Sequence, residues 1–180
     1  MKNKKLRFTL LLAVVAAALV TAAAATAASI TATATLTGTA GLSLNMPANP
    51  SMSTTLDGTD QTLTYSPVLG LVDARGSGAG WNLTISATSF SDGFGHTLAP
   101  GTVTGATQAC HAGSTCTLAT SSGITYPLTV SGTAAKFFNA AVNTGLGKVD
   151  VTPTVAVAVP GNSFAGTYTS TVTLVAATGP

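Results

Sequence analysis

Two short stretches of this 180-residue sequence hold side chains whose types and spacing suit them to chemistry. The first, Val72–Thr84, carries Asp73 and Arg75 two positions apart, then a glycine-rich run, then Trp81. The second, Cys110–Cys116, has two cysteines with a histidine between them. An acid beside a base can bind a polar ligand, an aromatic ring can carry a sugar, and paired thiols can hold a metal or form a disulfide.

The acid–base pair has two interpretations. Residues two apart share a face of an extended chain, so Asp73 and Arg75 can form a local ion pair that positions the glycine-rich turn. Exposed pairs of this kind contribute about 0–1 kcal/mol to stability. Alternatively, the two side chains form a polar ligand-binding edge beside the tryptophan. We favour the ion pair, and the candidate binding residues are Asp73, Arg75, Trp81 and Leu83.

The segment 81–90 alternates strictly between apolar and polar residues. This period of two predicts a β-strand with one buried and one solvated face. Trp81, the only tryptophan in the protein, is either a core anchor or an exposed platform for a sugar ring. Its phase favours the core, because aromatic side chains dominate such cores and it shares its face with Leu83 and Ile85.

The cysteine pair predicts a disulfide. Two cysteines in an exported chain permit one intramolecular pairing, Cys110 with Cys116. Closing so short a loop would stabilise the fold by about 2–2.5 kcal/mol. The alternative is a metal site that uses His111 together with His96. Structural zinc sites have four ligands at recognisable spacing, and only one histidine lies close to the cysteines, so we predict no metal.

No catalytic signature emerges from the rest of the chain. A G-x-S-x-G elbow is missing, and the five aspartates show no local pattern for glycoside cleavage. The glycines of 76–80 do not open a helix that would bind phosphate. The segment Asp57–Gln61 suggests calcium, but the protein has no glutamate to complete an EF-hand loop. We therefore predict a protein that is not an enzyme and needs no cofactor.

The N-terminus has the order of an export signal: basic residues, an apolar run at 8–20, then small residues. We predict a signal peptide over residues 1–27 and a single domain over 28–180. The apolar run is too short for a membrane span, which needs about 20 residues. No cysteine stands directly after the leader, as a lipoprotein anchor would require, and the C-terminus has no apolar span. We therefore expect any retention on the cell to be non-covalent.

The net charge changes when the leader is removed. Four of the seven basic residues belong to the leader, and the formal charge of +2 depends on them. Three basic residues and five aspartates remain, a net charge of −2. A nucleic-acid partner would need clustered lysine or arginine, so we predict none.

Short alternating segments separated by glycine and proline predict an all-β fold, an antiparallel β-sandwich. We also expect one helical turn at 134–142 and a loop at 106–118 that carries both cysteines. The expected strands cover residues 29–36, 42–46, 62–65, 81–90, 102–104, 124–130, 148–159 (with Pro153 as an interruption) and 166–176.

The stretch V-D-A-R-G-S-G-A-G-W-N-L-T resembles the first signature of the WxL domain of Gram-positive cell surfaces. Its W-x-L triplet is Trp81–Leu83 and its D-x-R-G is Asp73–Gly76. The family carries a second W-x-L in its last strand, where this chain has Leu174 instead of the tryptophan. The resemblance implies a secreted, wall-associated β domain that binds peptidoglycan or companion surface proteins.

A second hypothesis is a structural subunit of a surface fibre or coat. The alternating segment Ser29–Leu36 could add as a strand to the exposed sheet edge of a neighbouring subunit. Such a subunit would self-associate into polymers without walls, whereas a wall-binding module would stay monomeric and sediment with walls. The sequence leaves the ligand and the oligomeric state open.

Overall fold

The structure, a computed structural model, describes residues 31–38 and 41–180. The chain divides into two units, Met1–Thr35, of which only residues 31–35 are described, and Leu36–Pro180. The predicted signal peptide and the start of the first predicted strand lie outside the described residues. The described remainder of that strand, 31–36, is exposed and forms no strand, so this prediction is wrong there. Alternation with alanine is a weak strand signal, because alanine is a poor strand former.

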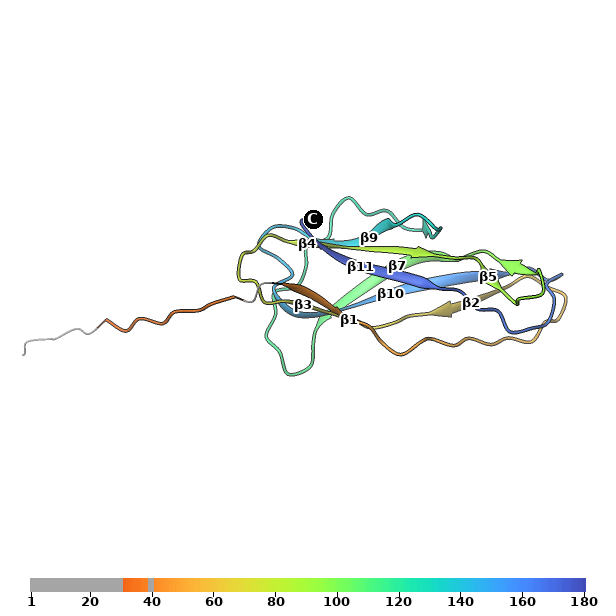
Figure 1. Cartoon of the computed structure of the whole chain (residues 1–180), viewed down its shortest axis with the longest axis horizontal. Helices are drawn as coiled ribbons and strands as arrows, with labels where there is room; N and C mark the ends of the chain where they lie inside the picture. Colours follow the sequence, from red (N-terminus) through yellow and green to blue (C-terminus); the bar gives the residue numbers. More distant parts are fainter. Residues whose placement is uncertain (1–30, 39–40) are drawn as a thin grey trace, which may run out of the picture. The chain divides into compact units, whose positions relative to one another are not determined.

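The second unit is all-β in its described part, an antiparallel sandwich as predicted (Figure 1). No helix long and apolar enough to cross a membrane occurs among the described residues. The strands are β1 (Leu42–Asn45), β2 (Gln61–Tyr65), β3 (Leu69–Asp73), β4 (Trp81–Ala87), β5 (Phe90–Ser91), β6 (Thr97–Leu98), β7 (Thr102–Cys110), β8 (Leu128–Thr129), β9 (Ala135–Ala140), β10 (Gly147–Val159) and β11 (Val172–Thr178).

The larger sheet is organised around β10. Its order is β1-β3-β10-β7-β8, and β2 also pairs with β10. On the side away from β7, the partners of β10 stop at Val151 and resume at Val155. Pro153 falls in this gap, where its missing N–H costs no ladder bond on that side. The valine-rich strand is therefore continuous through the proline that was expected to interrupt it.

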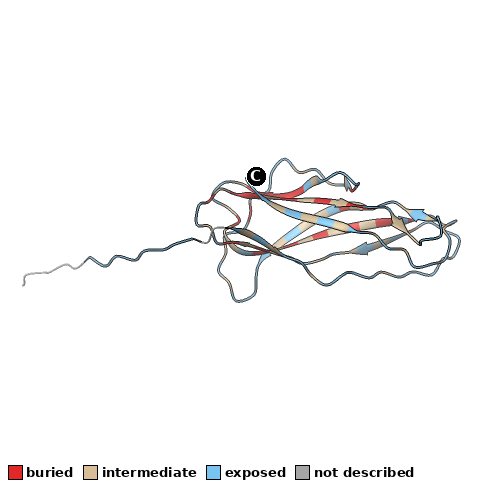
Figure 2. Cartoon of the chain, in the orientation of Figure 1, coloured by how far each residue is buried: buried red, intermediate tan, exposed pale blue. Residues whose placement is uncertain are grey.

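The smaller sheet has the order β11-β4-β9, and β5 and β6 form a separate two-stranded sheet. The core lies between the two sheets, where every second residue of β3, β4 and β10 is buried (Figure 2). The alternation that predicted these strands thus corresponds to one inward and one outward face. The core residues of the three strands are Leu69, Leu71, Trp81, Leu83, Ile85, Ala87, Val149, Val151, Val155, Val157 and Val159.

The predicted helical turn at 134–142 is wrong, because β9 is a strand paired with β4. Lys136 pairs with Thr84 and Phe138 with Leu83, so Phe137 is one extra residue in the ladder. Such a bulge lets two successive side chains turn the same way, and both phenylalanines are buried. The local pair of apolar residues is typical of a helix, which explains the error.

Other boundaries also differ from expectation: the strand expected at 81–90 ends at Ala87, and β3 was not expected as a strand. The predicted loop at 106–118 begins only after Cys110, because β7 continues to that residue along β10. The strand predicted at 124–130 is reduced to β8, which begins directly after Pro127 and lies at the edge of the larger sheet. The last strand begins at Val172, six residues later than its predicted start at Gly166.

Candidate functional site

Asp73 and Arg75 form the predicted ion pair, but it is buried. Asp73 is the last residue of β3 and is only 2% exposed. Arg75 donates from Nε to Asp73 Oδ1 and from Nη2 to Asp73 Oδ2, each at 2.8 Å. These hydrogen bonds hold the pKa of the Asp73 carboxyl below its ordinary value and raise the pKa of Arg75. The expectation of an exposed, weak pair is therefore wrong.

The same guanidinium reaches two further strands. Its Nη2 also donates to the Gly80 carbonyl at 2.9 Å, directly before β4. Its Nη1 donates to Thr178 Oγ1 at 2.7 Å, at the end of β11. We call Asp73, Arg75, Gly80 and Thr178 the Arg75 clasp. Because β3 belongs to one sheet and β4 and β11 to the other, the clasp ties the two sheets together at one end of the sandwich.

Trp81 is a core anchor with no exposed surface. Its Nε1 donates to the Gly145 carbonyl at 2.9 Å, and its ring centroid lies 6.1 Å from that of Phe138. Gly145 has a φ of +68°, and a Cβ there would lie 2.5 Å from the indole nitrogen. Leu83 is equally buried. Both side chains are fully buried in this conformation, and their role in binding stays a prediction.

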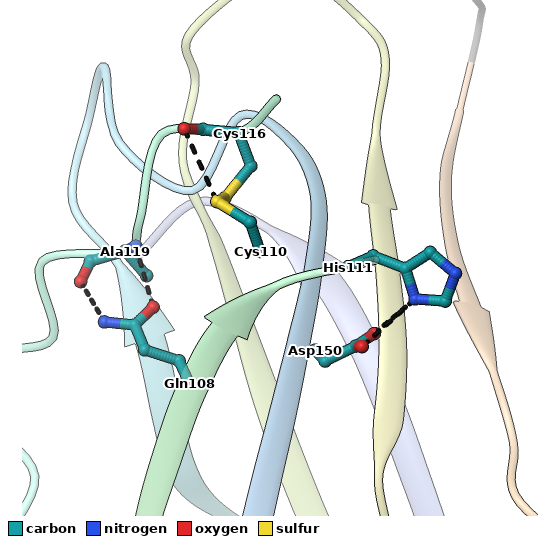
Figure 3. The surroundings of a disulfide bond; sticks show 6 residues. All are labelled: Gln108, Cys110, His111, Cys116, Ala119 and Asp150. Carbon is teal, nitrogen blue, oxygen red and sulfur yellow. Dashed lines mark hydrogen bonds and ion pairs between the residues drawn. A yellow bond between two sulfur atoms is a disulfide. The ribbon is translucent and has the colours of Figure 1, made fainter. Parts of the chain in front are cut away.

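The two cysteines form the predicted disulfide, with their Cα atoms 5.5 Å apart. The bridge joins the end of β7 to the loop that follows it. Gln108 closes the same loop, since its amide exchanges two hydrogen bonds with the backbone of Ala119 (Figure 3). His111 does not approach the sulfurs; its Nδ1 lies 3.0 Å from both carboxylate oxygens of Asp150. The loop is thus anchored by several independent contacts.

Among residues 31–38 and 41–180, no group of three or more His, Cys, Asp or Glu side chains comes together that could hold a metal. The second histidine, His96, has a different environment. Its ring stacks on Phe164, with centroids 3.9 Å apart and an interplanar angle of 17°. Its Nδ1 lies 2.5 Å from Asp92 Oδ2. The two histidines therefore lie in separate clusters.

His96 and Phe164 line a depression of about 220 Å³, which we call the aromatic pocket. It forms where the β5-β6 hairpin meets the segment after β10. Burial raises the pKa of Asp92, but hydrogen bonds from His96 and from the Phe94 backbone outweigh that effect, so the pKa is lowered. The residues that line the pocket are His96, Thr97, Leu98, Pro160, Asn162, Ser163, Phe164 and Tyr168.

A second depression of about 220 Å³ lies on the outer face of β1, β3 and β10. Gly70 leaves a gap there between the side chains of Asn45 and Asp150. Lys148 and His111 complete its polar side, and exposed Met46 its apolar side. This surface is charged, whereas the aromatic pocket contains no lysine or arginine.

Neither depression was predicted from the sequence. Phe94 and Phe164, which the structure exposes, sit in turn segments that read D-G-F-G-H and N-S-F-A-G. A large aromatic residue inside a glycine-rich turn has no strand face to bury it. This pattern is the sequence signal that indicates exposed aromatic rings at these two positions. An exposed aromatic ring was considered from the sequence only at Trp81.

A comparison with curated proteins gives no significant match. Residues 37–177 match the model of a family described as "WxL domain surface cell wall-binding". This span covers the described sandwich except for Thr178, the last residue of β11, and the two C-terminal residues. It includes the D-x-R-G of the Arg75 clasp and the Trp81–Leu83 triplet. The chain therefore belongs to the WxL domain family of surface, cell wall-binding domains.

Proposed function

We propose that this protein is an exported, non-enzymatic surface domain that associates non-covalently with the cell wall through direct recognition of wall polymer. The observation that carries the proposal is the family match, which spans nearly the whole sandwich. The Arg75 clasp and the disulfide favour a rigid surface, and a preorganised surface loses little conformational entropy on binding. Companion surface proteins are the alternative ligands.

A sedimentation experiment tests this proposal. The full chain, purified after export from a secreting host, is mixed with insoluble purified walls and pelleted at rising salt concentration. At 1 M salt the Debye length falls to about 3 Å, so binding that persists does not depend on exposed charges. We expect the protein to pellet with walls and not with cellulose. Protein that stays in the supernatant at low salt would contradict direct wall recognition.

The fibre-subunit hypothesis retains one favourable observation. Residues 31–37 are exposed, alternate between threonine and small or apolar residues, and are not part of a strand. Strand β11 lies at an edge of its sheet, where another strand could pair. Under this hypothesis the purified protein would form polymers without walls, and deletion of residues 31–37 would abolish them. Sedimentation velocity of the wall-free protein distinguishes the two proposals.

A further inference from the structure

Exposed aromatic residues gather at one end of the sandwich. Of the phenylalanine, tyrosine and tryptophan side chains in the described residues, only Phe94 and Phe164 are more than half exposed, at 88% and 61%. Phe94 lies in the turn of the β5-β6 hairpin, and Phe164 follows the last residue of β10 by five positions. Trp81 and the Arg75 clasp lie at the opposite end of β10, near Gly147. Isolated exposed apolar side chains are ordinary, so what matters is how Phe164 is held.

Phe164 is fixed in place by a chain of contacts. Its ring stacks on His96, whose Nδ1 is held by Asp92. Asp92 Oδ1 in turn accepts hydrogen bonds from the backbone N–H groups of Phe94 and His96, at 2.8 and 3.1 Å. Tyr168 donates its hydroxyl to the Phe164 carbonyl at 3.0 Å. The imidazole stacks on one face of the ring, and Phe164 as a whole residue remains 61% exposed.

The aromatic pocket presents no unpaired charge. The Asp92 side chain is 6% exposed, and its carboxylate is engaged by His96 and by two backbone donors. The other polar side chains of the pocket are neutral: Thr97, Asn162, Ser163 and Tyr168. An anionic polymer would find no lysine or arginine there. The pocket therefore combines a flat apolar face with neutral hydrogen-bonding groups.

Its size limits the ligand. A volume of about 220 Å³ is below the roughly 300–1,000 Å³ of pockets for drug-sized molecules, so it suits a single ring. A sugar ring has an apolar C–H face and a rim of hydroxyl and amide groups, which is the complement of this surface. An aromatic face carries partial negative charge and attracts the weakly positive C–H groups of such a ring.

We propose that the aromatic pocket binds one uncharged N-acetylated sugar ring of the wall glycan, stacked on the open face of Phe164. Asn162, Ser163 and Thr97 face the polar rim of the ring. The inference rests on the proposed wall association and names the surface and the ligand class. The pocket is preorganised, because the ring of Phe164 does not have to be ordered by the ligand.

Variants of Phe164 test the stacking contact. We expect Phe164→Ala to weaken binding to insoluble walls about tenfold, which corresponds to about 1.4 kcal/mol. Phe164→Leu should weaken it similarly, since leucine is apolar but not flat, and Phe164→Tyr should bind as the wild type does. The matched control is Val142→Ala, which removes an apolar side chain of similar exposure, 59%, at the opposite end. Melting temperatures check that every variant is folded.

Competition identifies the ligand class. Peptide-free glycan strands, prepared from the same walls with an amidase, are added to the pelleting assay, and the released stem peptides are added in a parallel series. The glycan strands should displace the protein and the stem peptides should not. Equal pelleting of wild type and Phe164→Ala, or displacement by stem peptides alone, would overturn the inference and leave wall association intact. If the wild-type protein itself does not pellet with walls, both the sugar-binding inference and the proposed wall association are contradicted.

Discussion

The Arg75 clasp makes a quantitative prediction about stability. We consider Arg75→Met, which keeps most of the aliphatic length of the side chain but removes the guanidinium. The variant leaves the Asp73 carboxylate, whose side chain has no exposed surface, without its cationic partner. Removing one member of a buried ion pair typically costs about 3–5 kcal/mol, whereas an exposed pair is worth about 0–1 kcal/mol.

The other bonds of the guanidinium add little to this cost. The Gly80 carbonyl also accepts the N–H of Gly179 at 3.2 Å, so it keeps a partner when Arg75 is lost. The Thr178 hydroxyl is on an exposed residue, where water replaces the arginine. The uncompensated carboxylate of Asp73 therefore dominates, and we expect Arg75→Met to lower the free energy of unfolding by about 3–5 kcal/mol at pH 7.

The stability lost in Arg75→Met should become smaller as the pH falls. In the folded protein the pKa of Asp73 is lowered, so the pair contributes fully above the carboxyl's ordinary pKa and loses its contribution as the pH falls through the lowered value. In the variant, acid protonates the buried carboxylate and relieves its penalty. The difference between wild type and Arg75→Met should therefore narrow towards low pH.

Urea unfolding followed by the fluorescence of Trp81 measures both effects, because this single tryptophan is buried beside the clasp. The matched control is Lys136→Met, the same kind of charge loss at an exposed site, which should change stability by less than about 0.5 kcal/mol. Equal slopes of the unfolding curves would show that only stability has changed. If Arg75→Met costs no more than Lys136→Met at pH 7, the argument from burial is refuted.

Two further stability predictions concern a glycine and the disulfide. Gly145→Ala should lower the free energy of unfolding by about 1–3 kcal/mol or more, because the positive φ disfavours a side chain and the new Cβ meets the Trp81 indole. The control is Gly132→Ala, which has open space around it, and thermal melts compare the two variants. The double variant Cys110→Ser and Cys116→Ser should lose about 2–2.5 kcal/mol from the loop-closure effect, measured by urea unfolding; an unchanged stability would mean that Gln108 and Asp150 suffice to hold the loop.

Much of the fold can be predicted from local sequence, because alternation reports directly on a two-faced sheet. This pattern predicts strands β4 and β10 and the burial of Trp81. The disulfide is predicted separately, because an exported chain with two cysteines permits one pairing. Strand β9 was not predicted, since the bulge at Phe137 breaks the period of two on which such a prediction depends. The sequence spacing of Asp73 and Arg75 predicted that they pair, but their burial depends on β4 and β11, which are distant in the chain.

The aromatic pocket could not be predicted from the sequence for a related reason. His96 and Phe164 come together only because the β5-β6 hairpin and the segment after β10 meet at one end of the sandwich, and Ser91 bridges to Thr169 there. No periodicity within either segment encodes that meeting. The sequence could indicate only that a phenylalanine stands in a glycine-rich turn.

The positions of these residues separate two roles within one domain. In the D-x-R-G and W-x-L motifs, Asp73 and Trp81 are buried and Arg75 joins the two sheets, whereas the exposed aromatic residues stand at the other end of β10. If the signature specifies the fold and the aromatic pocket contacts the glycan, their substitutions must behave differently. Arg75→Met should lower stability and wall binding together as the domain unfolds, and stabilising the fold with an osmolyte should restore both. Phe164→Ala should lower binding at unchanged stability, and no osmolyte should restore it.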